Sequence, residues 1–190
     1  MPVMRETAVD IIRHLQGAGH EAYLVGGCVR DELREVTPQD HDIATSAHPD
    51  EVEKLFTKTV GVGRQFGVML VVKQRQQYQV ATFRSDAEYI DGRRPTSVTF
   101  SNAKTDAKRR DFTINGLFLD PVTDTLHDWV DGQADLEAKQ LRTIGKPKER
   151  FGEDHLRLLR AVRFAAQLDF EIEPETFDAV RELAEKIQDI

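Results

Sequence analysis

Two carboxylates, Asp40 and Asp42, flank His41 directly before the apolar residues Ile43 and Ala44. On a strand, residues two apart face the same side, so both carboxylates point one way and His41 points the other way. Such a pair either repels itself or shares a divalent cation, and Mg²⁺ is held by one or two carboxylates together with substrate phosphates. The pattern predicts Asp40 and Asp42 as catalytic residues and as Mg²⁺ ligands. Taken alone, it is also the pattern of a solvated strand end.

A glycine pair, Gly26 and Gly27, lies between an apolar run at residues 22–25 and a helical pattern that contains Arg30. Glycines let another group approach the backbone closely, and the start of a helix presents free N–H groups to an anion. Arg30 could add a bidentate contact to a phosphate. The stretch predicts a phosphate-binding turn, with a simple turn and a surface arginine as the alternative.

A helical pattern begins at Glu153 and carries Asp154 and Arg157, three residues apart and therefore on one face of a helix. A carboxylate accepts hydrogen bonds from the exocyclic amine of a base, and a guanidinium donates to ring acceptors, so the pair could read a base edge. Arg160 and Arg163 continue this face and could reach a phosphate. The alternative is a helix whose acidic residues answer the helix dipole and whose arginines are solvated.

The charge of the chain is uneven. The net charge of −7 argues against a surface that binds nucleic acid everywhere, because phosphate backbones attract clustered Lys and Arg. Residues 140–163, however, contain seven Lys or Arg and three acidic residues, a local excess of +4. This basic stretch could hold a polyphosphate.

Composition limits the class of protein. Hydrophobic residues at 39% and charged residues at 31% exclude collagen-like, low-complexity and wholly disordered chains. The single cysteine, Cys28, cannot form an internal disulfide or a cysteine zinc site, which indicates a reducing compartment and a cytoplasmic location. No apolar run approaches the roughly 20 residues of a membrane helix, and the N-terminus has no signal-peptide core. We expect Cys28 to be a small packing residue, and the histidines show no metal-ligand spacing.

These residues must be positioned by a mixture of helices and strands. Apolar periodicity and turn residues predict helices at 7–16, 28–33, 50–56, from about 105, from 153 and at 176–187, and strands at 22–25, 41–44, 66–72, 78–83, 98–100 and 116–119. A polar loop is expected at residues 84–96. The order predicts an α+β fold with a boundary near residues 146–152, where the mixed pattern becomes all-helical.

Five stretches in this order resemble one family. They are GGCVRD at residues 26–31, DHD at 40–42, KRRDFTIN at 108–115, DWVDGQADL at 128–136 and EDHLR at 153–157. Together they are similar to the motifs of class II nucleotidyltransferases, which add nucleotides to RNA 3′ ends: tRNA CCA-adding enzymes, A-adding enzymes and bacterial poly(A) polymerases. The resemblance covers essentially the whole chain.

The resemblance implies a fold and an activity. The fold is a nucleotidyltransferase-type palm with a mixed or antiparallel sheet and flanking helices, here a head domain at residues 1–145. Residues 146–190 would start an all-helical neck, and the family's body and tail domains would be absent. The implied activity is Mg²⁺-dependent, template-independent addition of CMP and AMP to the 3′ end of tRNA. The implied partners are ATP, CTP and the 3′ end of tRNA or of another RNA.

The resemblance also implies roles for individual residues. Gly26, Gly27, Arg30 and Arg110 would hold the triphosphate. The motif that contains Arg110, Asp111 and Asn115 would recognise the sugar. Asp154 and Arg157 would select the base, and Arg160 and Arg163 would lie near the phosphates.

One feature of this chain differs from the family pattern, and a second bears on which activity within the family it has. The family usually carries a third acid on a later strand, and Gln79 stands at that place. The loop at 84–96, whose loss accompanies CC-only activity in the family, is present; its Arg93 and Arg94 could steer substrate or be solvated. The alternatives to the addition of CMP and AMP to tRNA are A addition, poly(A) synthesis, or a catalytically weak module that binds RNA or nucleotide. A small-molecule nucleotidyltransferase is disfavoured by the motifs at 108–115 and 153–157.

Overall fold

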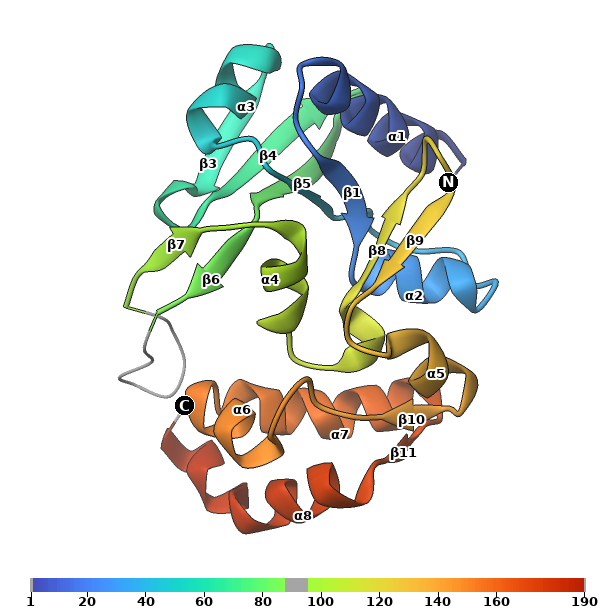
Figure 1. Ribbon diagram of the computed structural model, residues 1–190, viewed down its shortest axis with the longest axis vertical. Helices are drawn as coiled ribbons and strands as arrows, with labels where there is room; N and C mark the ends of the chain where they lie inside the picture. Colours follow the sequence, from blue (N-terminus) through green and yellow to red (C-terminus); the bar gives the residue numbers. More distant parts are fainter. Residues whose placement is uncertain (1, 88–95, 190) are drawn as a thin grey trace.

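A computed structural model describes residues 2–87 and 96–189 (Figure 1). Its helices are α1 (Pro2–Gly17), α2 (Gly27–Leu33), α3 (Pro49–Leu55), α4 (Ala103–Lys108), α5 (Gly132–Glu137), α6 (Pro147–Glu153), α7 (Leu156–Leu168) and α8 (Pro174–Glu182), with 3₁₀ turns η1 (Arg64–Phe66), η2 (Thr113–Asn115) and η3 (Ala184–Asp189). Its strands are β1 (Ala22–Val25), β2 (Ile43–Thr45), β3 (Thr59–Gly63), β4 (Val68–Lys73), β5 (Gln76–Thr82), β6 (Arg84–Asp86), β7 (Val98–Phe100), β8 (Leu117–Asp120), β9 (Thr125–Asp128), β10 (Gln140–Leu141) and β11 (Glu171–Ile172). None of the described helices is both long enough and apolar enough to cross a membrane.

A seven-stranded mixed sheet forms the upper part of the molecule in Figure 1, in the order β3-β4-β5-β2-β1-β8-β9. Strand β2 lies at its centre, next to β1; β1 pairs antiparallel with β2 and β8, whereas β2 pairs parallel with β5. The α+β fold with a mixed sheet and flanking helices is therefore confirmed. The central position of β1 and β2 matters because the glycine turn and the acidic pair adjoin these two strands.

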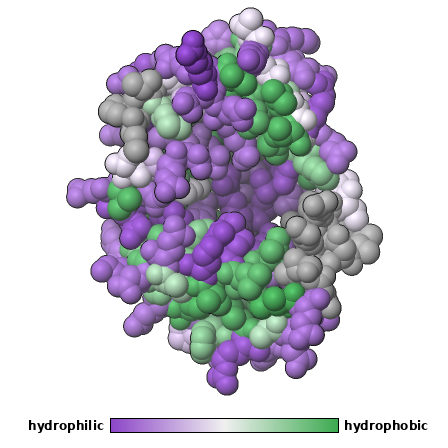
Figure 2. Space-filling model, turned by 180° about the vertical axis from the view of Figure 1, so that it is seen from behind, coloured by the Kyte–Doolittle hydropathy of each residue, from purple (hydrophilic) through white to green (hydrophobic). Residues whose placement is uncertain are grey.

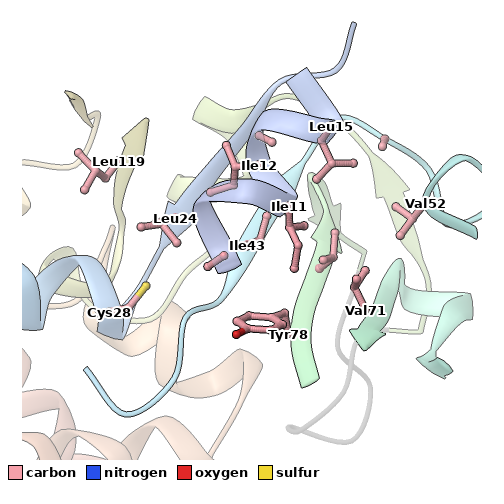
Figure 3. Packing of buried hydrophobic residues seen from close by; sticks show 14 of the residues in the cluster. Ile11, Ile12, Leu15, Leu24, Cys28, Ile43, Val52, Val71, Tyr78 and Leu119 are labelled. Carbon is pink, nitrogen blue, oxygen red and sulfur yellow. The ribbon is translucent and has the colours of Figure 1, made fainter. Parts of the chain in front are cut away.

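One face of the sheet is covered by α1. The helix buries Ile11, Ile12 and Leu15 completely against the strands, because apolar residues recur at the three- and four-residue spacing of one helix face. In Figure 3, Ile12 lies near Leu24 and Ile43 of β1 and β2, and Leu15 lies on the side of α1 toward Val52. This face of the sheet carries the main hydrophobic core.

The opposite face of the sheet carries a second, smaller core. It contains Val25, Ala44 and Phe118 from the strands and Ala103 and Ala107 from α4. Successive residues of a strand point to opposite faces, so Leu24 faces α1 while Val25 faces α4. Helix α4 thereby brings the arginines that follow it to the end of β1.

The helical part below the sheet in Figure 1 has a core that it does not build alone. Phe151, Leu158 and Phe164 of α6 and α7 are buried there together with Phe112, just before η2, and Ile114, within η2. A short parallel ladder between β10 and β11 ties the segment before α6 to the segment before α8. The two parts of the chain therefore share buried contacts, and the domain division at residue 145 stays a prediction.

The element predictions differ from the structure in several places. The single helix expected from residue 153 is wrong: α6 and α7 are separated at Asp154, whose φ and ψ of −141° and 104° are those of an extended residue. Helices α5 and α6 and strands β3, β9, β10 and β11 were not predicted. The expected loop at 84–96 begins with strand β6, which pairs with β7, and its Arg93 and Arg94 lie outside the described residues.

Gly132, the first residue of α5, provides a test of this packing. A Cβ atom at this position would clash with the backbone carbonyl of Thr113 and lie 3.0 Å from Leu117 Cδ2. We expect Gly132→Ala to lower the free energy of unfolding by about 1–3 kcal/mol, as overpacking usually does. The measurement is urea unfolding followed by the fluorescence of Trp129, the single tryptophan.

Gly17 at the end of α1 is the matched control, since a Cβ there would meet no atom within 4 Å. Gly17→Ala should change stability by less than about 0.5 kcal/mol. Equal unfolding midpoints for the two variants would contradict the packing described for α5.

Candidate active site

A cleft of about 640 Å³ lies between the sheet and the helical part. Seen from behind, the middle of the molecule is hollowed and hydrophilic (Figure 2). The cleft is lined by Gly26, Gly27, Arg30, Asp40, Asp42, Arg109, Arg110, Asp111, Asn115, Asp154, Leu156, Arg157, Arg160, Arg163 and Phe164. Every residue that the sequence singled out as catalytic or nucleotide-binding is in this set. Three further residues line the cleft without having been predicted: Arg109, Leu156 and Phe164.

The acidic pair enters the cleft from the segment before β2. The backbone N–H of Val25 donates to the carbonyl oxygen of Asp42 at 3.0 Å, so this segment continues the pairing between β1 and β2. Asp42 is half-buried and Asp40 is exposed. Burial, together with the negative charge of Asp40, raises the pKa of Asp42, although the charge of Arg110 opposes the shift. A cation between the two carboxylates would relieve this repulsion.

His41 lies on the opposite side of the acidic segment. Its side chain is buried, and its Nε2 atom is 3.6 Å from Glu32 Oε1 on α2. Arg5 on α1 holds Glu32 with two hydrogen bonds, from Nε at 2.8 Å and from Nη2 at 3.0 Å. The acidic segment is thus backed by two helices.

The donor set suits Mg²⁺ better than a metal that needs a closed cage. Among residues 2–87 and 96–189, no group of three or more His, Cys, Asp or Glu side chains is arranged to hold a metal ion. Two carboxylates that line an open cleft leave ligand positions for phosphate oxygens and water, as Mg²⁺ sites commonly do. The residues present therefore fit this ion.

The residue at the expected third acid is a neutral neighbour of the pair. Val80 of β5 lies opposite Ile43 in the parallel ladder, so Gln79, one residue earlier, adjoins Asp42 on the next strand. Gln79 is exposed and is not part of the cleft lining. Strand β5 therefore adds no carboxylate to the cleft.

The glycine turn places α2 against the arginines of the cleft. Gly26 has a φ of +73°, a conformation that favours glycine, and a Cβ atom there would lie 3.2 Å from Arg110 Nη1. Arg30 is only 6% exposed; it donates to Asn115 Oδ1 at 2.9 Å and to Asp31 Oδ1 at 2.9 Å. The guanidinium is consequently fixed along the wall of the cleft.

Cys28, next to this turn, takes no part in chemistry. Its thiol is buried and donates to the carbonyl oxygen of Val25 at 3.3 Å. Burial raises the pKa of Cys28 to about 12, so the thiolate needed for nucleophilic attack is absent at neutral pH. Cys28 packs in the core, as its sequence context suggested.

Two arginines of the cleft donate hydrogen bonds to one buried carboxylate. Asp106 on α4 is 1% exposed and accepts from Arg109 Nε at 2.9 Å and from Arg110 Nη2 at 3.0 Å. Burial by itself would raise the pKa of Asp106, but the charges of Arg110 and Arg109 outweigh it and hold the pKa below its usual value. The Arg110 guanidinium also lies 4.9 Å from the centre of the Phe118 ring. Both arginines are therefore anchored at the cleft.

Asp111 connects this segment to α7. One carboxylate oxygen accepts from the Phe112 backbone N–H at 2.8 Å and from Asn115 Nδ2 at 3.2 Å. The other accepts from Arg160 Nε at 2.7 Å. Because Asn115 also accepts from Arg30, a continuous chain of hydrogen bonds joins α2 to α7 beside the cleft.

The predicted base-reading pair lines the cleft, but its geometry differs from the prediction. Asp154 is in the break between α6 and α7, not three residues from Arg157 on one helix, and its Oδ1 accepts from the Leu156 backbone N–H at 3.0 Å. Burial raises the pKa of Asp154. Arg157 is 6% exposed and donates to Glu153 Oε2 at 2.6 Å and to the Arg150 carbonyl at 3.1 Å. Arg157 thus connects α6 to α7, and Asp154 is the more accessible member of the pair.

Phe164 is a lining residue that the sequence analysis did not single out. Its ring centre lies 5.4 Å from the Arg30 guanidinium, 5.0 Å from that of Arg160 and 5.1 Å from that of Arg163. The four-residue spacing between Arg160 and Phe164 was the available signal. Arg109 was likewise visible in the motif at 108–115 but was not singled out.

Comparison with known proteins finds a matching family and several similar proteins. Residues 22–142 match the family described as the poly A polymerase head domain. The CCA-adding enzyme of Enterococcus faecalis (strain ATCC 700802 / V583) is 50% identical over 184 residues, which cover 95% of this chain and 45% of that protein. The chain spans about half the length of the curated relatives it matches.

Two solved structures are similar to the chain. The crystal structure of the Bacillus stearothermophilus CCA-adding enzyme in complex with CTP has a TM-score of 0.82 and 42% identity, and the match covers 90% of this chain and 41% of that one. The Thermotoga maritima CCA-adding enzyme complexed with tRNA-CCA has a TM-score of 0.77 and 26% identity, and the match covers 98% of this chain and 43% of that one.

The buried ion pairs of Asp106 predict a pH-dependent stability. At pH 7, Asp106→Asn should lower the free energy of unfolding by about 3–5 kcal/mol, because it leaves two arginines without their buried partner. Since the pKa of Asp106 is lower in the folded chain than in the unfolded chain, its stabilising contribution is full above the unfolded value of about 4. That contribution is lost as the pH falls through the folded value.

Urea unfolding of the wild type and of Asp106→Asn at pH 7 and at pH 3 measures this effect. The difference in the free energy of unfolding between the two proteins should be smaller at pH 3 than at pH 7. The control is Asp50→Asn, which removes an exposed ion pair with Arg64 and should cost less than about 1 kcal/mol at either pH. If Asp106→Asn and the wild type had nearly the same free energy of unfolding at pH 7, the anchoring role of Asp106 would be contradicted.

Proposed function

The chain belongs to the family of the poly A polymerase head domain, and on this premise we propose that it forms the nucleotide-transferring part of an RNA 3′-nucleotidyltransferase. The observation that carries the proposal is the composition of one cleft: two carboxylates at the end of the central strands face six arginines. Carboxylates suit a metal ion, and the arginines suit a triphosphate. The metal ion and the triphosphate would therefore come together in this cleft.

We propose CMP and AMP addition to the 3′ end of tRNA as the activity, with ATP and CTP as the nucleotides. The names of the relatives, and the CTP and tRNA-CCA in two similar structures, support this choice. Addition of A alone and poly(A) synthesis are the alternatives within the family. The lone buried thiol suits a reducing compartment, and the cytoplasm is the proposed location.

The proposed division of labour follows the positions of the side chains. Asp40 and Asp42 would hold Mg²⁺, which when bound neutralises negative charge on the triphosphate and favours ionisation of the RNA 3′-hydroxyl. Arg30 and Arg110, fixed by Asn115 and Asp106, would orient the phosphates beside the glycine turn. Because both guanidiniums are already held in place, little reorganisation is needed when the substrate binds.

Base selection would fall mainly to Asp154. Its carboxylate is at the break between α6 and α7 and lines the cleft opposite the glycine turn, where it can accept from an exocyclic amine. Arg157, whose donors reach Glu153 and the Arg150 carbonyl, would support Asp154 by fixing the two helices. In this proposal, residues 1–145 act as the head and residues 146–190 begin the neck.

Removing either carboxylate tests the metal site. Asp40→Ala and Asp42→Ala should each reduce incorporation of labelled CMP into tRNA that lacks CCA by at least about 100-fold, since electrostatic stabilisation at the phosphate is lost. Binding of Mn²⁺, followed by electron paramagnetic resonance, should weaken in both variants. Circular dichroism should stay that of the wild type, because neither side chain is part of the hydrophobic core.

Asp178→Ala, at an exposed carboxylate on α8, is the control and should leave both readouts unchanged. Unchanged Mn²⁺ binding in the Asp40 and Asp42 variants would remove the proposed site. Normal nucleotide and Mn²⁺ binding by the wild type without any incorporation would favour a nucleotide-binding module.

Asp154→Ala tests base selection. We expect a loss of about tenfold in the preference for ATP and CTP over GTP and UTP, since discrimination by one base-edge contact is worth about 1–3 kcal/mol. The measurement is incorporation of each nucleotide in separate reactions. If variant and wild type had the same nucleotide preference, Asp154 would serve only to cap the start of α7.

A further inference from the structure

Three arginines from two helices converge on one aromatic ring at the cleft. Arg30 comes from α2, whereas Arg160 and Arg163 come from α7, and all three guanidiniums lie within 5.4 Å of the centre of the Phe164 ring. The negative face of a phenyl ring attracts a cation at this distance. Phe164 is therefore the point at which cationic groups of the sheet domain meet those of the helical part.

The convergence is electrostatically unfavourable without a bound anion. Like charges this close repel each other, and only two of the three have an acidic partner: Asp31 is 2.8 Å from Arg30, and Asp111 accepts from Arg160 at 2.7 Å. Arg163 is exposed and forms no ion pair with any residue that the structure describes. An uncompensated positive charge remains, and it faces the cleft.

The ring itself is buried and packed against a second aromatic ring. Phe164 is 8% exposed and belongs to the core shared by the two parts of the chain. It packs edge-to-face against Phe112, with ring centres 5.9 Å apart and an interplanar angle of 85°. Phe112 also donates its backbone N–H to Asp111, the partner of Arg160. The position of the ring is thus fixed by the same segment that orients one of the arginines.

We propose that Phe164 is a positioning residue for polyphosphate binding: its ring gathers Arg30, Arg160 and Arg163 into one anion site. The inference rests on the proposed function, because the anion would be the triphosphate of the incoming nucleotide. Phe164 itself touches no phosphate in this arrangement. An aliphatic side chain of similar size would fill the same space but would leave three guanidiniums without the attraction that offsets their repulsion.

The test replaces Phe164 by 4-fluoro-, 3,5-difluoro- and pentafluorophenylalanine, and by leucine. Fluorination weakens the attraction of the ring for cations while keeping its shape, so a packing role alone would not respond to it. Calorimetry measures the affinity for inorganic tripolyphosphate without metal. We expect a stepwise loss across the fluorinated series and a loss of about tenfold for Phe164→Leu, and KM for ATP should rise more than kcat falls.

Phe170→Leu is the matched control. Phe170 lies in the same hydrophobic cluster and contacts one arginine, Arg34, which is not part of the cleft lining. Its replacement should leave tripolyphosphate affinity unchanged. Equal affinity across the fluorinated series, with a wild type that binds normally, would overturn the inference and leave the proposed function standing. No tripolyphosphate binding by the wild type would overturn both.

Discussion

The carboxylate of Asp111 is the interaction on which the arrangement of the cleft depends. One of its oxygens fixes the turn at Phe112 and Asn115, and the other accepts from Arg160 on α7. Through Asn115 the same network reaches Arg30 on α2. Elements that are far apart in the sequence are thereby held at set distances, so the cleft is preorganised and its shape is not left to flexible side chains.

An acidic chain can hold a cationic cleft because its acids are placed behind the arginines. The net charge is −7, yet the cleft lining contains six arginines and four aspartates. Asp106 is buried below Arg109 and Arg110, and Glu153 holds Arg157. Each of these pairings fixes a guanidinium and removes part of its conformational freedom before a ligand arrives. Local pairing, more than overall charge, thus sets the electrostatics of the site.

Sequence reasoning found what depends on local pattern and missed what depends on tertiary contact. The run at 22–25 and the stub at 98–100 are strands with those bounds, and the residues of the motifs line one cleft. The break at Asp154 was missed because helical periodicity continues across it. The burial of Arg157 was missed because the carbonyl oxygens to which it donates, those of Arg109 and Arg150, are brought beside it only by the folded structure. Phe164 looked like any core aromatic, since the arginine from α2 is distant in the sequence.

The shared core under the cleft restricts how the molecule can move. Phe112 and Ile114 are buried among side chains of α6 and α7, and the ladder between β10 and β11 closes the same region. Rotating the helical part away from the sheet as a rigid body would expose these residues to water, at the free-energy cost of losing apolar burial. Ligand exchange is therefore easier by movement of exposed side chains such as Arg163 and by adjustment at the Asp154 break than by a wide hinge opening. The lower wall of the cleft behaves as a fixed platform, and only its exposed side chains supply adaptability.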